Sequence, residues 1–140
     1  MPDVIVRGTT TGFAQQITAS AHRLAADEPV AAGGTDTGPN PYELLLAALG
    51  ACTSMTVAMY ARRKAWPLEN VTVSLRHFRE HAADCRDCET KEGLLDRIDC
   101  DIELSGRLTA EQKQRLLEMA NKCPVHRTLT SEIDIRTRAV

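Results

Sequence analysis

The sequence predicts a single domain, residues 1–140, that mixes helices with antiparallel strands. A run of strong helix formers without an interior proline extends from Pro41 to about Ala65. Two later segments, Val71–His77 and Ile98–Leu104, alternate apolar and polar residues, which is the period of half-buried strands. A second helical pattern follows Thr109. A chain of 140 residues is long enough for one hydrophobic core, so no second domain is expected.

The N-terminal part predicts a hairpin and then a loop. Residues that favour strands surround Gly8 and Thr11-Gly12, which indicates strands at Val4–Arg7 and roughly Ala14–Leu24. The following loop, Gly33–Pro39, is rich in glycine and proline and ends where the long helix begins.

The long helix has a clear beginning and an apolar middle. Asn40 is a favourable N-cap, Pro41 suits the first helical position, and Glu43 can reach back to the Asn40 N–H. A helix of roughly 25 residues is about 37 Å long. Apolar residues surround nearly the whole helix before the basic triplet at residues 62–64, so a central, buried helix is expected.

The C-terminal half predicts one more helix and one more strand. Thr109 and Gln112 have the spacing of a capping box, and Pro124 should end the helix that they begin. Ile133–Thr137 alternates as a last strand, and Arg79–Glu92 is a long polar connection.

Composition disfavours several classes of partner. The net charge is −2 and only 4% of the residues are aromatic, so neither nucleic acid nor an anionic membrane surface is an expected partner. No secretory signal is visible at the N-terminus, and a cytoplasmic protein is expected. Its five cysteines should then be reduced and serve catalysis, metal binding or packing.

Cys52 and Cys123 are the candidate reactive thiols. Cys52 lies in the apolar part of the long helix, where it either packs as a small hydrophobe or acts as a nucleophile beside a cation supplied by Arg7, Arg23 or Arg127. Cys123 lies where the second helix ends, and the negative end of a helix dipole disfavours a thiolate. If both react, Cys52 should attack and Cys123 should condense with it; otherwise Cys123 packs under the helix cap.

The other three cysteines are predicted to have different roles. Cys100 shares a strand face with apolar residues and should be buried. The spacing His77-x3-His81-x3-Cys85-x2-Cys88 resembles a tetrahedral zinc site. A vicinal dithiol and an ordinary solvated loop are the alternatives, because acidic residues surround the two cysteines.

The order of these motifs resembles the OsmC/Ohr family of thiol peroxidases, in a divergent OsmC-like branch. The matching features are the glycine-rich loop, the Pro41-Tyr42-Glu43-Leu44-Leu45 helix start, Cys52 shortly after it, and Cys123-Pro124 following a second helix. The resemblance covers essentially the whole chain.

The resemblance implies an α+β fold in which antiparallel sheets wrap a long central helix and two protomers form an intertwined homodimer. It further implies an antioxidant enzyme that reduces organic hydroperoxides, with Cys52 peroxidatic, Cys123 resolving, and a dithiol or lipoylated protein as the reductant. No cofactor is required, although zinc is possible. An arginine of the N-terminal hairpin and a glutamate of the helix start support the thiolate in this family.

Arg7 and Glu43 are the candidates for those supporting roles. The family glutamate lies ten residues before the cysteine, where this chain has Tyr42, and Glu43 is the next residue. The alternative function is a zinc-binding or redox-sensing protein on the same fold, without efficient peroxidase activity. His77, His81, Cys85 and Cys88 would carry that alternative.

Overall fold

The computed structural model describes residues 3–86 and 88–140. The chain divides into two compact units, Met1–Leu45 and Leu46–Val140. The helix α1, Pro41–Arg63, begins in the first unit and continues through the second.

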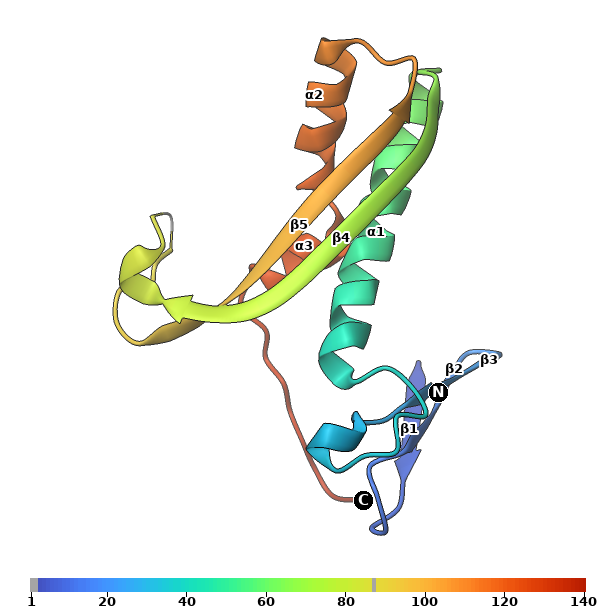
Figure 1. Cartoon of the computed structure of the whole chain (residues 1–140), viewed down its shortest axis with the longest axis vertical. Coiled ribbons are helices and arrows are strands. Elements are labelled where there is room, and N and C mark those ends of the chain that lie inside the picture. The colour runs from blue at the N-terminus through green and yellow to red at the C-terminus, as the bar shows by residue number, and fades with distance from the viewer. Residues whose placement is uncertain (1–2, 87) are drawn as a thin grey trace. The chain divides into compact units, whose positions relative to one another are not determined.

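The first unit contains a three-stranded antiparallel sheet in the order β1-β2-β3 (Figure 1). Its strands are β1 (Val4–Gly8), β2 (Gln15–Ala19) and β3 (His22–Ala26). The prediction of one continuous second strand is therefore wrong. Ser20 adopts a φ of 54°, a left-handed conformation that reverses the chain between β2 and β3. No glycine or proline marks this turn in the sequence.

A buried carboxylate organises the loop after β3. Asp27 is 2% exposed and accepts hydrogen bonds from the Glu28 N–H and from the N–H and hydroxyl groups of Thr35 and Thr37. The Thr37 and Thr35 hydroxyls are the main cause of a pKa for Asp27 far below its ordinary value. At Gly34 a Cβ would collide with the Glu28 carbonyl, so glycine is required where the loop closes on itself.

The start of α1 confirms the predicted capping box. The Asn40 Oδ1 accepts a hydrogen bond from the Glu43 N–H at 2.8 Å, and the Glu43 carboxylate accepts one from the Asn40 N–H at 3.1 Å. The helix therefore begins where the local sequence predicts.

The second unit is built on a long two-stranded antiparallel ribbon of β4 (Leu68–His81) and β5 (Leu94–Gly106). Leu75 pairs with Cys100, and His81 pairs with Leu94 at the far end. Both strands are longer than the alternation predicted. The ribbon extends into the polar connection, and only the short helix η2 (Ala82–Asp84) and the loop after it join the strands.

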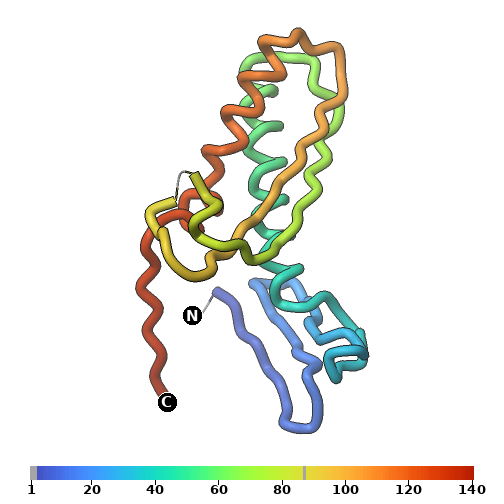
Figure 2. The backbone as a smooth tube through the Cα atoms, turned by 60° about the vertical axis from the view of Figure 1, so that its left-hand side comes forward, coloured from blue at the N-terminus to red at the C-terminus, as the bar shows by residue number. Residues whose placement is uncertain are grey.

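The body of α1 and the helix α2 (Ala110–Ala120) lie along this ribbon (Figure 2). The core consists of Val57, Ala61, Leu116 and Ala120, packed against partly buried side chains that include Trp66, Ile102 and Leu104. Gly50 brings α1 close to β4, because a Cβ there would lie 2.7 Å from the Leu75 Cδ1. The predicted capping box of α2 is also present, with Thr109 and Gln112 bonded reciprocally.

Only one stripe of α1 is buried within the single chain. The stripe follows the helical repeat through Leu49, Thr53, Val57 and Ala61. Elsewhere on the helix, Met55 is 70% and Met59 54% exposed. By length and composition alone α1 is apolar enough to cross a membrane, but the core helices of soluble proteins pass the same test.

The C-terminal segment differs from the prediction. A short helix, α3 (Pro124–Leu129), begins at the proline that should only have ended a helix. The strand expected at Ile133–Thr137 is absent from the described residues, and Ile133 and Ile135 are 51% and 79% exposed. An alternating segment becomes a strand only where another strand pairs with it, and none does so here.

Candidate functional site

Cys123 is completely buried and is the N-cap of α3. Its Sγ accepts a hydrogen bond from the His126 N–H at 3.2 Å. The expectation that Cys123 lies at a helix end of unfavourable polarity is therefore wrong. The helix α2 already ends at Ala120, and Pro124 starts the next helix, since proline needs no hydrogen-bond donor at the first helical position. The backbone thus directs a donor at the sulfur.

Thr53 of α1 forms the other polar contact of Cys123. Its Oγ1 lies 3.7 Å from the Cys123 Sγ and also donates to the Leu49 carbonyl at 2.8 Å. The hydroxyl carries one proton, so a negatively charged sulfur would compete with the carbonyl for it. Sequence reasoning missed Thr53. The available signal was one polar residue within the apolar stripe at every fourth position of α1.

A surface hollow of about 420 Å³ lies beside this buried thiol. Thr53, Cys100, Asn121 and His126 are among its lining residues. Cys100 is exposed, contrary to the prediction that its strand face would be covered. Farther along the same strand face, Ile102 and Leu104 pack against the core.

The surroundings of Cys100 keep it protonated. Partial burial of the thiol raises its pKa, and the Asp99 carboxylate, Cys123 and Asp101 add to the increase. A thiol that is protonated at neutral pH is a weak nucleophile. Cys100 is thus poorly suited to begin a reaction with an electrophile.

Cys52 is a free, half-buried cysteine next to Thr53 on α1. Adjacent helical residues project about 100° apart, so Thr53 and not Cys52 faces the Cys123 sulfur. Folding therefore brings Cys123 to the helical turn that carries Cys52, although the two cysteines are 71 residues apart in sequence.

The predicted supporting residues have defined local positions. Arg7 lies on β1 and Glu43 in the cap of α1, both in the first unit, and Arg23 lies on β3. Arg127 lies on α3, where its N–H donates to the Cys123 carbonyl. All four side chains are exposed within the single chain. Their roles in catalysis stay predictions.

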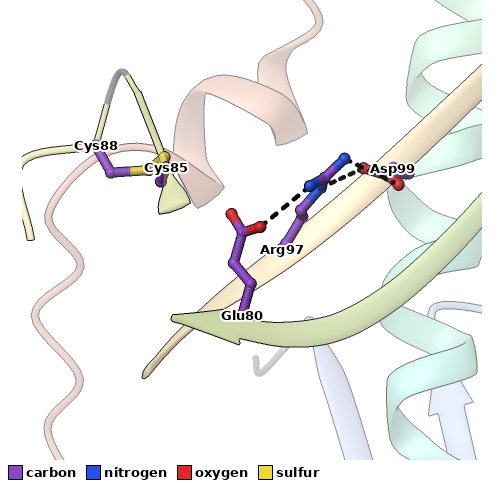
Figure 3. Close-up of a disulfide and its surroundings, with 5 residues drawn as sticks. All are labelled: Glu80, Cys85, Cys88, Arg97 and Asp99. Atoms are coloured by element: carbon purple, nitrogen blue, oxygen red, sulfur yellow. Dashed lines mark hydrogen bonds and ion pairs between the residues drawn. A yellow bond between two sulfur atoms is a disulfide. The ribbon is translucent and has the colours of Figure 1, made fainter. Parts of the chain in front are cut away.

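The cysteines of the predicted zinc motif form a disulfide, Cys85–Cys88, in the β4–β5 connection (Figure 3). His77 on β4 is hydrogen-bonded through Nε2 to Asp96 at 2.8 Å, and this bond is the main cause of a lowered pKa for Asp96. His81 is the exposed last residue of β4. Among the described residues no group of three or more His, Cys, Asp or Glu side chains is arranged around a metal position. Zinc binding stays a prediction and requires the disulfide to be reduced, because thiolates are the ligands.

Fold and site together define a class: an α+β protein with a buried cysteine that caps a short helix beside the middle of a long central helix. Comparison with protein-family models identifies the particular family. The model described as OsmC-like protein matches residues 34–138, and the chain belongs to this family. A search of curated protein sequences found no match.

Solved structures of OsmC and Ohr proteins share the fold. An OsmC-like protein from Mycoplasma pneumoniae has a TM-score of 0.71 at 19% identity, covering 91% of this chain and 85% of its own. An organic hydroperoxide resistance protein OsmC from Legionella pneumophila has a TM-score of 0.65 at 19% identity, with coverage of 94% and 90%. OhrB of Bacillus subtilis, named an organic hydroperoxide resistance protein, has a TM-score of 0.62 at 21% identity, with coverage of 94% and 91%. The predicted α+β fold with antiparallel sheets and a long central helix is confirmed.

Proposed function

We propose that the protein is a cysteine-based peroxidase that reduces organic hydroperoxides. The observation that carries the proposal is the contact of the Thr53 hydroxyl with the Cys123 sulfur, which brings the second cysteine to the helical turn of Cys52. Two free thiols then lie within one part of the second unit. Structural neighbours named as organic hydroperoxide resistance proteins support the substrate class.

The chemistry divides between the two cysteines. The Cys52 thiolate attacks the outer oxygen of the hydroperoxide, the O–O bond breaks, and the alkoxide that leaves takes a proton from water to become an alcohol. Cys52 becomes a sulfenic acid, and the Cys123 sulfur attacks it to form a disulfide and release water. A dithiol, either a small molecule or a lipoylated protein, returns two electrons and two protons. No bound redox cofactor is needed, because the cysteines themselves carry the electrons.

Resolution requires Cys123 to leave its helix cap. Sulfur atoms in a disulfide are about 2.05 Å apart, whereas the Cys123 sulfur is held by the His126 N–H and faces Thr53. We expect disulfide formation to weaken the sulfur cap of α3, because the Cys123 sulfur must turn from these partners toward Cys52. We expect oxidation to loosen this short helix.

Arg7 and Glu43 are proposed to support the Cys52 thiolate. A guanidinium stabilises a thiolate, and a carboxylate can orient the guanidinium. The Glu43 carboxylate already has a partner in the Asn40 N–H, so its catalytic role requires the second carboxylate oxygen.

A homodimer is proposed as the working assembly. In the first unit, an apolar stripe crosses the sheet through the paired residues Val6, Ile17 and Leu24, and Val6 and Leu24 are 56% and 49% exposed. In the second unit, Met55 and Met59 of α1 are exposed as well. Exposed apolar patches of this kind are typical of protein interfaces.

Hydroperoxide consumption by defined variants tests the function. With tert-butyl hydroperoxide and excess dithiothreitol, Cys52→Ser should reduce consumption to background, because the proposal assigns the attack on the hydroperoxide to the Cys52 thiol. Cys123→Ser should retain the first turnover and accumulate a sulfenic acid that dimedone traps. Cys100→Ser is the matched control and should consume hydroperoxide at the wild-type rate. Undiminished turnover by Cys52→Ser would overturn the proposal.

A further inference from the structure

The Cys85–Cys88 disulfide has no part in the peroxidase reaction proposed above. The two Cα atoms are 5.6 Å apart, a usual separation for a disulfide. Both cysteines are half-buried, so neither residue is enclosed in the core. They line a surface hollow of about 330 Å³ in the second unit.

Other interactions already hold this end of the ribbon together. The pairing of β4 with β5 continues to His81 and Leu94, and the Ala82 N–H donates a hydrogen bond to the Gly93 carbonyl at 2.9 Å. Arg97 on β5 forms an ion pair with Glu80 on β4 at 3.1 Å, which links the two strands, and a second with Asp99 of its own strand at 2.7 Å (Figure 3). Because a cross-link stabilises a fold less when it closes a shorter loop, a bond between residues three positions apart contributes little. The disulfide is therefore not needed to stabilise this end of the ribbon.

The charges around the hollow select among thiols. Among the described residues, four carboxylates line it, those of Glu80, Asp84, Asp96 and Asp99, against the guanidinium groups of Arg86 and Arg97 and that of Arg79, which pairs with Asp96 at 3.4 Å. An excess of negative charge repels an anionic thiol and favours a neutral or cationic one. A dithiol has a further advantage, because its second thiol can displace the protein from the mixed disulfide.

We propose that Cys85 and Cys88 form a thiol–disulfide exchange site, separate from Cys52 and Cys123, that is reduced by neutral or cationic dithiols. One thiolate of the dithiol attacks one sulfur, the Cys85–Cys88 bond breaks, and the other cysteine leaves as a thiolate and takes a proton. The second thiol of the reagent then attacks the mixed disulfide and forms a cyclic disulfide. Two electrons and two protons pass from the dithiol to the cysteine pair.

Position-resolved alkylation of the full-length, folded protein tests this site. The protein is equilibrated with mixtures of reduced and oxidised dithiothreitol, alkylated, and mapped by peptide mass. We expect Cys85 and Cys88 to become labelled together in one two-electron transition, with an unchanged circular dichroism spectrum and full re-oxidation. Release of the pair only after unfolding, or failure to re-oxidise, would overturn the proposal.

Thiols of different charge test the electrostatic preference of the site separately. Among monothiols at equal thiolate concentration, cationic cysteamine should reduce the pair fastest, neutral 2-mercaptoethanol next and anionic glutathione slowest, and added salt should narrow the differences. Equal rates, or a rate order reversed from this one, would contradict the assignment of neutral or cationic reagents.

Two further measurements separate this site from zinc binding and from the peroxidase. If stoichiometric zinc blocks re-oxidation and a chelator restores it, the pair is a metal site and the proposal fails. The variant Cys85→Ser/Cys88→Ser should still consume hydroperoxide at the wild-type rate, and Cys52→Ser should still show the paired transition. Loss of that transition in Cys52→Ser would show that the two sites are one and contradict the separation.

Discussion

Thr53 and Cys123 lie 70 positions apart in sequence, and the Thr53 hydroxyl oxygen is 3.7 Å from the Cys123 sulfur. Both residues are buried, and Thr53 is the immediate neighbour of Cys52. The contact connects the start of α3 to the middle of α1. The proposed resolving thiol thereby has a fixed position in the reduced protein.

Replacing Thr53 by valine should release Cys123 from this contact. We expect Thr53→Val to lower the free energy of unfolding by about 1 kcal/mol and to increase labelling of Cys123. Thr56→Val is a matched control, because Thr56 donates to the Cys52 carbonyl in the same way but does not touch the sulfur. Urea denaturation and position-resolved alkylation measure both effects. Equal Cys123 labelling in the two variants would contradict a specific role for Thr53.

The Cys100 thiol should react slowly at neutral pH. Its pKa is raised, so the thiolate needed for labelling forms only above the ordinary cysteine range near pH 8.5. Asp101→Asn should accelerate labelling modestly, since burial and not this carboxylate is the largest cause. Maleimide labelling of the Cys100 peptide between pH 6 and 10 gives the profile. A labelling rate that reaches its plateau below pH 8 would refute this assignment.

Asp27 should make the first unit sensitive to acid. Its folded-state pKa is lowered, so its stabilising effect is complete above the unfolded value near 3.9 and decreases as the pH falls below it. Thermal melts of the wild type and Asp27→Asn between pH 2 and 7 test this. We expect Asp27→Asn to melt at a lower temperature at pH 7, with a difference that narrows in acid. A difference that stays constant down to pH 2 would show that ionisation of Asp27 is irrelevant.

The exposed methionines of α1 provide a test of the dimer. Met55→Glu should dissociate a homodimer into monomers, because it would place a charge in an apolar interface. Glu69→Gln, at an exposed position of β4, is a control for a change of charge. Analytical ultracentrifugation gives the mass of each variant. A wild type that sediments as a monomer would remove the homodimer from the proposal.

Local signals in the sequence predicted the local parts of the fold. The capping boxes at Asn40 and Thr109 depend only on residues three positions apart, and both form as expected. The turn at Ser20 has no such signal, because its left-handed residue is neither glycine nor asparagine.

The candidate site was less predictable, because it depends on tertiary contacts. The sequence identified Cys123 and its position before Pro124, but the same proline is compatible with a helix end and a helix start. The partner of the Cys123 sulfur comes from a helix 70 residues earlier. The alternation of apolar and polar residues predicted a strand at Ile133–Thr137 and burial of Cys100. Neither is found, because each requires tertiary contacts that the described residues of the single chain do not make.

Peptide mass mapping after one equivalent of an organic hydroperoxide tests the central proposal most directly. The protein is first reduced and then freed of reductant, and oxidation is carried out without added thiol. We expect a new disulfide-linked peptide pair containing Cys52 and Cys123, which is absent from Cys52→Ser. If both thiols remain free while Cys85, Cys88 or Cys100 is oxidised, the assignment of Cys52 and Cys123 is wrong.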